Sequence, residues 1–496
     1  MDTGHTLFDF HLSKKISCRA VFILSFLFTY GFVFAQSTWH RTYGGMSDDG
    51  GLGLIETPDS GYIVVGYTGS FGSGASDAYL IKTDSLGIFQ WYKTYGGANV
   101  DIAQKIIKAQ TNGYILAGYS NSNTLDYDMW VLRLNENADT IWTKKIGGPD
   151  WDRANAVVSC EDGTYILAGE TYSGNNQFAD GMLIKFDDTG LELWTATFSL
   201  PGNQSFNDIV RISPTRYAVT GSTENSITLE SDGFLLFLDE NGNFLDTIYF
   251  DTGNNEYLQA MAIAPDFDIM LGGYYTYDST AFPKSIQIKT DTLGQVQFTL
   301  PGPIPDDYGM QILSYGHFTG DIFFFAGRSF YKSSEDHQAV FFRSFFDGFP
   351  EWFKNYGIIG KDDGYNAVIK SYDNGFVCTG FTQSFGPGTQ ALLLSKINAQ
   401  GDINSGTTVD INEHALISES ANINVYPNPS DRIFYILSPV EFTYRVLDVN
   451  ARPIRVLNSS PNLNAELDMS GHKAGFYFIE MTFADGSIRY HKIGLN

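Results

Sequence analysis

The chain has 496 residues, more than one small hydrophobic core requires, so at least two domains are expected. Its 51 glycines, 29 tyrosines and 39 phenylalanines favour short strands and tight turns over helices. The formal net charge of −25 argues against nucleic acid and anionic membranes as partners, because both are bound through basic patches. Cations, neutral glycans and proteins remain open as ligands.

Residues 1–35 have the pattern of a secretory signal peptide. Basic residues precede an apolar run at 20–30, and Ala35 precedes a predicted cleavage before Gln36. A membrane anchor is the alternative, but the apolar run is too short to span a bilayer. No later segment approaches that length, so we expect no transmembrane segment in the mature chain.

A unit of about 52 residues then recurs along 39–404. Two markers repeat independently of each other. A tryptophan-type position recurs at Trp39, Trp91, Trp142, Trp194, Asp246, Phe298 and Trp352. A glycine within a β-branched or aromatic run recurs at Gly66, Gly118, Gly169, Gly221, Gly272, Gly327 and Gly380. Both markers give seven copies.

Each unit contains four predicted strands, which in the first copy are 52–57, 62–68, 78–83 and 89–95. Four short antiparallel strands in about 50 residues are typical of a propeller blade. A solenoid has shorter repeats, and a separate sandwich domain needs roughly 100 residues. The sequence therefore predicts an all-β protein with a seven-bladed β-propeller at 36–404.

The seventh unit lacks its fourth strand, because the chain turns polar after Gly401. A spare copy of that strand stands at the other end of the repeat, at 39–45. Pairing it beside 391–398 would close the ring and remove an exposed edge. We predict that the N-terminal strand completes the last blade.

Residues 405–422 lack aromatic side chains and are predicted to be a linker. Residues 423–496 contain no copy of the repeat and are neutral, with seven basic and seven acidic residues. Their short strands predict a small β-sandwich.

This last block resembles the type A C-terminal sorting domain of cargo for the type IX secretion system of Gram-negative bacteria. The resemblance rests on five elements in the order of the family: Tyr426-Pro427-Asn428-Pro429, Val446-Leu447-Asp448, Leu467-Asp468-Met469-Ser470, Gly475-Phe476-Tyr477-Phe478 and Lys492. It implies an immunoglobulin-like sandwich read by the outer-membrane export machinery, and a protein that passes through the periplasm to the cell surface or the medium. The chain departs from the family at 450–452, where a Gly-Lys or Gly-Arg turn is usual.

The repeats resemble the delta-60 and quinoprotein-like propeller repeats of secreted bacterial proteins. The shared hairpin is Asp84-x-x-Gly87-x-x-x-Trp91, which returns as Asp187-x-x-Gly190-x-x-x-Trp194. This resemblance implies a fold and no substrate.

Loops that join fourth to first strands and second to third strands emerge on one face of a propeller. Five of these loops place a carboxylate at the entry of the first strand, at Asp49, Asp101, Asp152, Asp307 and Asp363. A ring of this kind could bind cations, sugars or a protein loop. A structural role is the interpretation we favour, since short polar side chains accept backbone N–H bonds in turns.

No catalytic set stands out. The adjacent pairs Asp306-Asp307, Glu335-Asp336 and Asp362-Asp363 could serve glycoside hydrolysis, but acidic pairs are common on acidic surfaces. The histidines lack metal-ligand spacing, and no Gly-rich loop opens a helix. We expect no cofactor, and whether a metal is bound stays open.

Two hypotheses follow for function. The first is a monomeric, non-catalytic binding or adhesion module for an extracellular glycan or protein, exported through its sorting domain. The alternative is a propeller glycoside hydrolase or lyase that acts on extracellular polysaccharide. This alternative requires two or more carboxylates that are absent from the other copies of the repeat. They would have to lie close together at the mouth of the central channel.

Overall fold

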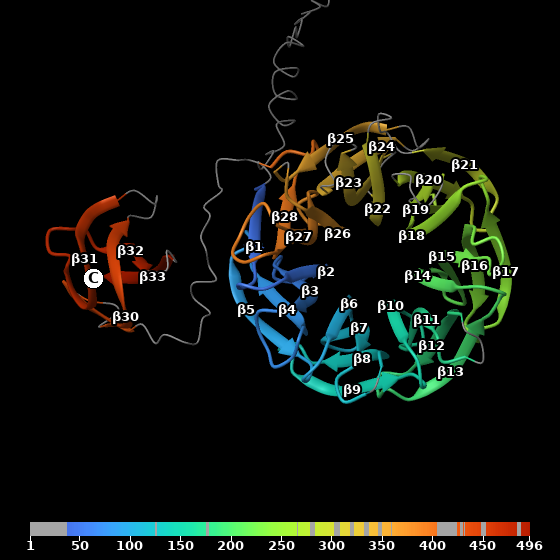
Figure 1. Cartoon of the computed structure of the whole chain (residues 1–496), viewed down its shortest axis with the longest axis horizontal. Helices are drawn as coiled ribbons and strands as arrows, with labels where there is room; N and C mark the ends of the chain where they lie inside the picture. Colours follow the sequence, from blue (N-terminus) through green and yellow to red (C-terminus); the bar gives the residue numbers. More distant parts are fainter. Residues whose placement is uncertain are drawn as a thin grey trace, which may run out of the picture. The chain divides into compact units, whose positions relative to one another are not determined.

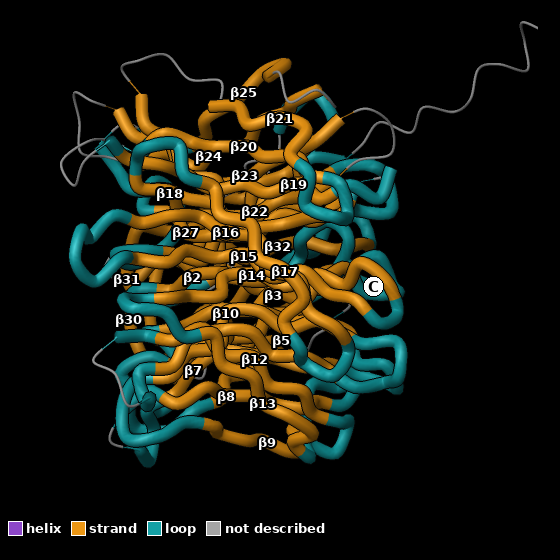
Figure 2. The backbone as a smooth tube through the Cα atoms, turned by 90° about the vertical axis from the view of Figure 1, so that its right-hand side faces the viewer, coloured by secondary structure: helices purple, strands orange, loops and turns teal. Residues whose placement is uncertain are grey.

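The computed structural model describes residues 37–403 and much of 424–496. Excluded within these ranges are 125, 175–177, 265, 278–282, 302–307, 318–321, 332–336, 346–349, 359, 427–429, 431, 448–452 and 484–487. The predicted signal peptide and linker also lie outside the described residues. The described residues form strands and loops without an α-helix (Figure 2). Within them we find no apolar helix of membrane-spanning length.

Seven four-stranded antiparallel sheets form the blades of a propeller. Blade 1 holds β2 (Asp49–Glu56), β3 (Tyr62–Thr68), β4 (Asp77–Thr83) and β5 (Phe89–Tyr95); blade 2 holds β6 (Asp101–Lys108), β7 (Tyr114–Ser120), β8 (Asp128–Leu134) and β9 (Thr140–Ile146). Blade 3 holds β10 (Asp152–Ser159), β11 (Tyr165–Thr171), β12 (Asp180–Phe186) and β13 (Glu192–Phe198); blade 4 holds β14 (Gln204–Ser213), β15 (Arg216–Glu224), β16 (Ser231–Asp239) and β17 (Phe244–Phe250). Blade 5 holds β18 (Asn255–Ile263), β19 (Ile269–Thr276), β20 (Lys284–Thr290) and β21 (Val296–Pro301); blade 6 holds β22 (Tyr308–His317), β23 (Ile322–Tyr331), β24 (His337–Phe345) and β25 (Pro350–Tyr356). Blade 7 holds β26 (Asp363–Lys370), β27 (Phe376–Thr382), β28 (Ala391–Ile397) and β1 (Trp39–Tyr43).

The blades follow one another around a ring, with β2, β6, β10, β14, β18, β22 and β26 innermost (Figure 1). The N-terminal strand closes this ring. β1 pairs antiparallel with β28, with Trp39 opposite Lys396 and Tyr43 opposite Leu392. The predicted seven-bladed fold and its closure by the N-terminal strand are confirmed.

The propeller has two faces that we name after their connections. The turn face carries the turns between first and second strands and between third and fourth strands, such as 57–61 and 84–88 in blade 1. The loop face carries the connections between fourth and first strands and between second and third strands, such as 44–48 and 69–76.

A β-bulge explains the glycine that marks each repeat. In all seven blades the register between the inner and second strands shifts by one residue at the same place. A Cβ at Gly66 would lie 1.9 Å from the carbonyl oxygen of Gly50, so only glycine fits. In blade 5 this position is Gly273, whose Cβ would lie 2.1 Å from the carbonyl oxygen of Tyr257. The assignment of Gly272 to the repeat is therefore wrong by one residue.

Tryptophans of the fourth strands join neighbouring blades on the turn face. The indole of Trp142 packs on Gly190 of the next blade and donates from Nε1 to the carbonyl oxygen of Asp188 at 2.9 Å. Gly190 has a φ of 82°, which favours glycine. Trp194 packs on Gly242 in the same way. The repeated hairpin motif thus supplies contacts between blades.

In four blades a buried lysine of the third strand forms an ion pair with an aspartate in the turn between the first and second strands. The pairs are Lys82–Asp59 at 2.9 Å, Lys185–Asp162 at 2.9 Å, Lys289–Asp266 at 2.8 Å and Lys396–Asp373 at 2.7 Å. Burial would raise the pKa of these aspartates, but hydrogen bonds and the lysine charge lower it. The pKa of Asp59 falls to about 2.

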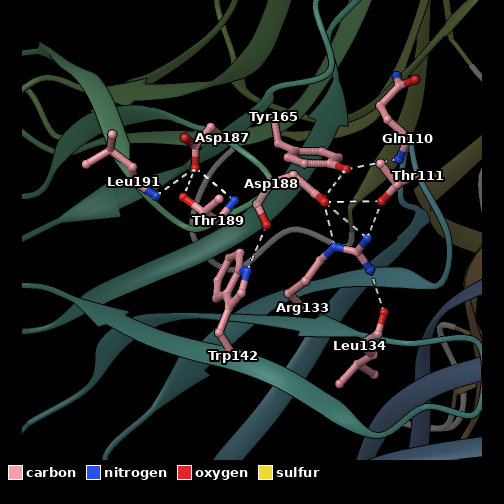
Figure 3. Close-up of polar contacts among 10 residues, drawn as sticks. All are labelled: Gln110, Thr111, Arg133, Leu134, Trp142, Tyr165, Asp187, Asp188, Thr189 and Leu191. Carbon is pink, nitrogen blue, oxygen red and sulfur yellow. Dashed lines mark hydrogen bonds and ion pairs between the residues drawn. The ribbon is translucent and has the colours of Figure 1, made fainter.

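Blade 2 varies this arrangement with an arginine (Figure 3). Thr111 stands where four other blades have the aspartate, and Arg133 reaches Asp188 of blade 3 instead. The Arg133 Nε–Asp188 Oδ1 distance is 2.7 Å, and the arginine side chain is 3% exposed. The hydroxyl of Tyr165 donates to the same Asp188 oxygen at 3.0 Å. The ion pair therefore connects two blades.

The C-terminal strands form a separate five-stranded sheet. They are β29 (Asn424–Tyr426), β30 (Ile433–Leu447), β31 (Pro453–Asp468), β32 (Gly475–Phe483) and β33 (Ile488–Leu495). The path is β29-β30-β32-β33, and β31 also pairs with β30. Phe434, Val446, Leu467, Ile479 and Ile493 belong to its core. The small β unit expected after the propeller is confirmed.

Candidate functional site

The predicted carboxylates of the loop face are buried at the starts of the inner strands. Asp49, Asp101, Asp152 and Asp363 begin β2, β6, β10 and β26, and none is more than 1% exposed. Asp101 Oδ2 accepts the backbone N–H of Gly97 at 2.8 Å and the hydroxyl of Ser122 at 2.6 Å. Asp307 lies outside the described residues.

Asp49 and Asp152 make the same two contacts. Asp49 Oδ2 accepts from the N–H of Gly45 and the hydroxyl of Ser70, both at 2.7 Å. Asp152 Oδ2 accepts from Gly148 and Ser173 at 2.8 Å. These carboxylates hold the loops in place. A direct role in binding stays a prediction, and a ligand at this face would meet the loops and strand ends first.

In six blades the side chain of the bulged residue in the inner strand lies toward the centre of the ring. The bulged residues Leu52, Gln104, Asn155, Asn207, Gln259 and Asn366 line a central cavity of about 360 Å³. Five of these six side chains are amides, which can donate and accept hydrogen bonds without a charge.

Three of these amides also join consecutive blades. Asn155 Nδ2 donates to the carbonyl oxygen of Phe206 at 2.9 Å, and Asn207 Nδ2 donates to that of Leu258 at 2.8 Å. Asn366 of blade 7 donates at 2.9 Å to Gly51 of blade 1, across the closure of the ring. The channel lining is therefore part of the scaffold.

Among the described residues that line the central cavity, Asp208 is the one carboxylate, and it already has partners. Asp208 Oδ2 accepts the backbone N–H of Met261 at 3.0 Å. Its Oδ1 lies 3.7 Å from Lys105 Nζ of blade 2. Both oxygens of this carboxylate therefore have a partner within the protein.

A larger cavity of about 560 Å³ opens on the loop face between blades 1 and 2, and we call it the mouth cavity. Tyr67 and Tyr119 line it from the ends of β3 and β7. Its other lining residues are Ser47, Asp48, Leu52, Gly69, Ala75, Ser76, Ile102 and Gln104. Aromatic faces thus stand beside hydroxyl, amide and carboxylate groups.

Both tyrosines of the mouth cavity keep neutral hydroxyl groups. Burial raises the pKa of Tyr67 and of Tyr119 above the ordinary value of 10.0. The Tyr67 hydroxyl accepts from Gln390 Nε2 at 2.7 Å. The side chains can therefore stack and hydrogen-bond, but a tyrosinate base is disfavoured.

An arginine on three aromatic rings lies beside this cavity. The guanidinium carbon of Arg153 lies 5.3 Å from the ring centre of Tyr119, 5.6 Å from that of Tyr127 and 4.9 Å from that of Trp151. Glu170 Oε1 lies 3.9 Å from Arg153 Nη1. Trp151 is 47% exposed, so one aromatic surface of this cluster faces solvent.

Blades 6 and 7 bring a histidine and a carboxylate together on the same face. His337 Nδ1 lies 2.8 Å from Asp362 Oδ1. Burial would raise the pKa of Asp362, but the hydrogen bonds and charge of His337, with Arg328 nearby, lower it. The guanidinium of Arg328 stacks on Phe381 at 4.7 Å.

The sequence prediction missed Tyr67 and Tyr119 of the mouth cavity, and it also missed Glu170 and Arg328. Their signal lies in the residue that follows each marker glycine, which changes between blades while its neighbours repeat: Tyr67, Tyr119, Glu170, Ser222, Tyr274, Arg328 and Phe381. A comparison of the copies position by position could have found them.

The predicted sorting residues lie in the C-terminal sheet. Gly475 begins β32 and pairs with Leu495, while Tyr426 ends β29 and Lys492 lies in β33. The hydroxyl of Tyr477 donates to the carbonyl oxygen of Lys473 at 2.7 Å. Pro427, Asn428 and Pro429 lie outside the described residues.

Comparison with solved structures finds similar propellers. A polysaccharide lyase of family PL25, an ulvan lyase, has a TM-score of 0.45 at 10% identity, over 71% of this chain and 95% of that chain. The β-propeller domain of the Trilobed protease from Pyrococcus furiosus has a TM-score of 0.40 at 10% identity, over 76% and 99%. The α-L-arabinanase of Penicillium chrysogenum has a TM-score of 0.39 at 10% identity, over 73% and 99%. At such identities a likeness concerns the fold and carries over no substrate.

None of the curated proteins compared with the chain matches it. Residues 424–493 match the family model described as the secretion system C-terminal sorting domain. This match and the five-stranded sheet agree on the same block of the chain. The protein is therefore a β-propeller that carries a type IX sorting domain and is exported to the cell surface or the extracellular space.

Proposed function

We propose that the exported propeller is a binding module that holds an extracellular ligand at its loop face without catalysing a reaction. The mouth cavity is the observation that carries this proposal. Tyr67 and Tyr119 come from neighbouring blades and line it together with Gln104. Its volume of about 560 Å³ suits a ligand of a few sugar rings or a short peptide loop.

The lining favours a neutral glycan as ligand. Aromatic faces stack on the apolar faces of sugar rings, while amide and hydroxyl groups bond their hydroxyls. Asp48 is the one charged side chain of the lining, and it can accept hydrogen bonds from a sugar. No basic residue lines the cavity to attract a polyanion.

The carboxylates near the channel argue for binding over hydrolysis. Glycoside hydrolysis uses two carboxyl groups about 5 to 10 Å apart across the scissile bond. Asp48 is the single carboxylate of the mouth cavity, Asp208 is paired with Lys105, and Glu170 lies beside Arg153.

A neutral-oligosaccharide array followed by calorimetry tests the proposal. Tyr119→Ala should weaken the binding of the best ligand about tenfold or more through lost stacking. Tyr372→Ala is the matched control, because Tyr372 is 65% exposed and lies in the 371–375 turn of the turn face. Equal affinities for wild type and Tyr119→Ala would contradict binding at the mouth cavity.

One observation favours the alternative, a hydrolase or lyase on extracellular polysaccharide. Asp362 holds His337 through Nδ1, an arrangement that orients an imidazole for proton transfer, and Arg328 could stabilise developing negative charge. The test is incubation with neutral and acidic polysaccharides, followed by assays for reducing or unsaturated ends. Turnover that His337→Gln abolishes would replace the binding proposal.

The sorting role has its own test. Deletion of 423–496 should leave the folded propeller in the periplasm, because the export machinery would lose its signal. Cell fractionation with an antibody to the propeller measures this. Normal export of the shortened chain would contradict the role of the C-terminal domain.

A further inference from the structure

The junction of blades 4 and 5 has an extra carboxylate at a position where other junctions have a small residue. The residue after the fourth strand is Gly44, Gly96, Gly147 or Gly357 at four junctions, and Ser199 at the junction of blades 3 and 4. A Cβ at Gly96 would lie 2.4 Å from Asp101 Oδ2, and one at Gly357 would lie 2.2 Å from Asp363 Oδ2. After β17 the chain has Asp251 at this position. It lies close to Glu256, which is the acid of the inner strand β18.

Asp251 completes a group of three carboxylates. One oxygen each of Asp232, Asp251 and Glu256 lies within 4.8 Å of the other two. Asp232 belongs to β16 of blade 4, Glu256 to β18 of blade 5, and Asp251 to the connection between the blades. Among the described residues, no other three carboxylate, histidine or cysteine side chains gather in this way.

The burial of Glu256 indicates that a ligand belongs beside it. Its side chain is 0% exposed. Oε1 accepts the hydroxyl of Thr252, whereas Oε2 is buried without a hydrogen-bond partner. A buried anionic oxygen of this kind is costly unless a cation or donor compensates it. Asp49, Asp152 and Asp180 also keep one such oxygen, but none of them belongs to a described group of three carboxylates.

The electrostatics agree with an absent positive charge. Burial raises the pKa of Glu256, and the hydrogen bonds from Thr252 offset this only in part, while the neighbouring Asp232 and Asp251 raise it further. Burial, and then Asp251 and Glu230, raise the pKa of Asp232. A bound cation would offset both effects.

We propose that Asp232, Asp251 and Glu256 bind a calcium ion taken up from the extracellular medium. All three offer hard oxygen ligands, which calcium prefers, and water or backbone carbonyls can complete six to eight ligands. The exposed side chain of Asp251 leaves a path from solvent. The ion would connect β16 of blade 4 to β18 of blade 5 and fix the connection at 251–254 on the loop face.

Calorimetric titration of the full chain with CaCl2, after chelation of bound ions, tests the proposal. We expect one ion per chain, with a Kd between about 0.1 and 1 mM, as in extracellular calcium modules. Asp251→Gly restores the residue of four other junctions, so it should fold, which far-ultraviolet circular dichroism checks. Its affinity should be at least about tenfold weaker, because one of three charged ligands is gone.

Asp150→Asn is the matched control. Asp150 is an exposed carboxylate in the corresponding connection between blades 2 and 3, away from the three acids. Its variant should bind calcium as the wild type does. The proposal is overturned if the wild type shows no binding up to about 10 mM. It is also overturned if Asp251→Gly binds as tightly as wild type, if Asp150→Asn loses as much affinity, or if MgCl2 binds equally well.

Discussion

On the two faces of the propeller, most carboxylates with shifted pKa values are shifted in opposite directions; the exceptions are Glu56 on the turn face, whose pKa is raised, and Asp362 beside His337 on the loop face, whose pKa is lowered. On the turn face the pKa is lowered for Asp59, Asp162, Asp188, Asp266 and Asp373. On the loop face it is raised for Asp49, Asp77, Asp128, Asp232 and Glu256. Burial raises the pKa in both sets, but only the turn-face set lies against lysine or arginine partners strong enough to reverse the shift.

This difference separates scaffold from candidate site. The turn-face acids are neutralised by side chains of the protein itself, so they stabilise the ring and leave little charge for a ligand. The loop-face acids are compensated mainly by backbone and hydroxyl donors. Their remaining charge is where a cation or a sugar hydroxyl can bind.

The largest expected effect comes from two tryptophans on opposite faces. Trp142→Ala on the turn face should lower the free energy of unfolding by about 3 kcal/mol, because its ring packs on Gly190 of the next blade. Trp151→Ala on the loop face should cost less than about 1 kcal/mol, since that side chain is 47% exposed. Urea denaturation measures both. Equal losses of unfolding free energy in the two variants would contradict the distinction between a supporting turn face and a binding loop face.

A smaller effect should follow from the ion pair between blades 2 and 3. Arg133→Met should cost about 2 kcal/mol, because Asp188 loses a buried partner but can still reach solvent. The control is Lys93→Met, whose partner Asp139 is largely exposed, and it should leave stability unchanged. A loss in the control as large as in Arg133→Met would show that burial of the pair does not matter.

The smallest effect is a pH dependence of opposite sign on the two faces. The turn-face acids stabilise the fold above their unfolded pKa near 4, and this contribution is lost as the pH falls through the folded pKa, to about 2 for Asp59. Loop-face acids have raised folded pKa values, so their burial becomes less unfavourable as the pH falls.

Two variants separate these contributions. Asp59→Asn should reduce the loss of stability between about pH 4 and 2, and Glu256→Gln should reduce the opposite change at higher pH. Chemical denaturation followed by tryptophan fluorescence at stepped pH measures both in calcium-free buffer. Changes of the same sign in the two variants would contradict the comparison.

The fold could be predicted from the sequence because the sequence contains seven copies of each strand pattern. Even the closure by β1 followed from counting, since one strand was missing at 402–404 and one was spare at 39–45. The bulge could not be predicted. An extra residue in the inner strand leaves the apolar pattern nearly unchanged. The marker glycine of blade 5 was misassigned for another reason, because Gly272 and Gly273 are adjacent and the sequence alone does not separate them.

The candidate site was only partly predictable. The sequence placed Asp49 and its copies at strand entries and favoured a local backbone bond such as that from Gly45, but the burial of Asp49 and its bond from Ser70 depend on contact between two loops. The mouth cavity was missed because nothing within a single repeat distinguishes Tyr67 or Tyr119 from the other aromatic residues of the strands. Asp251 could not be found from the repeat, because it stands where four other junctions have glycine.

The central claim is that the loop face binds and the turn face supports it. The most direct measurement is the affinity of one array-selected neutral glycan for wild type, Tyr67→Ala, Tyr119→Ala and Arg133→Met, each shown to be folded at the assay temperature. The account predicts a loss of about tenfold or more in both tyrosine variants and wild-type affinity in Arg133→Met. Wild-type affinity in the tyrosine variants, or a matching loss in Arg133→Met, would contradict it.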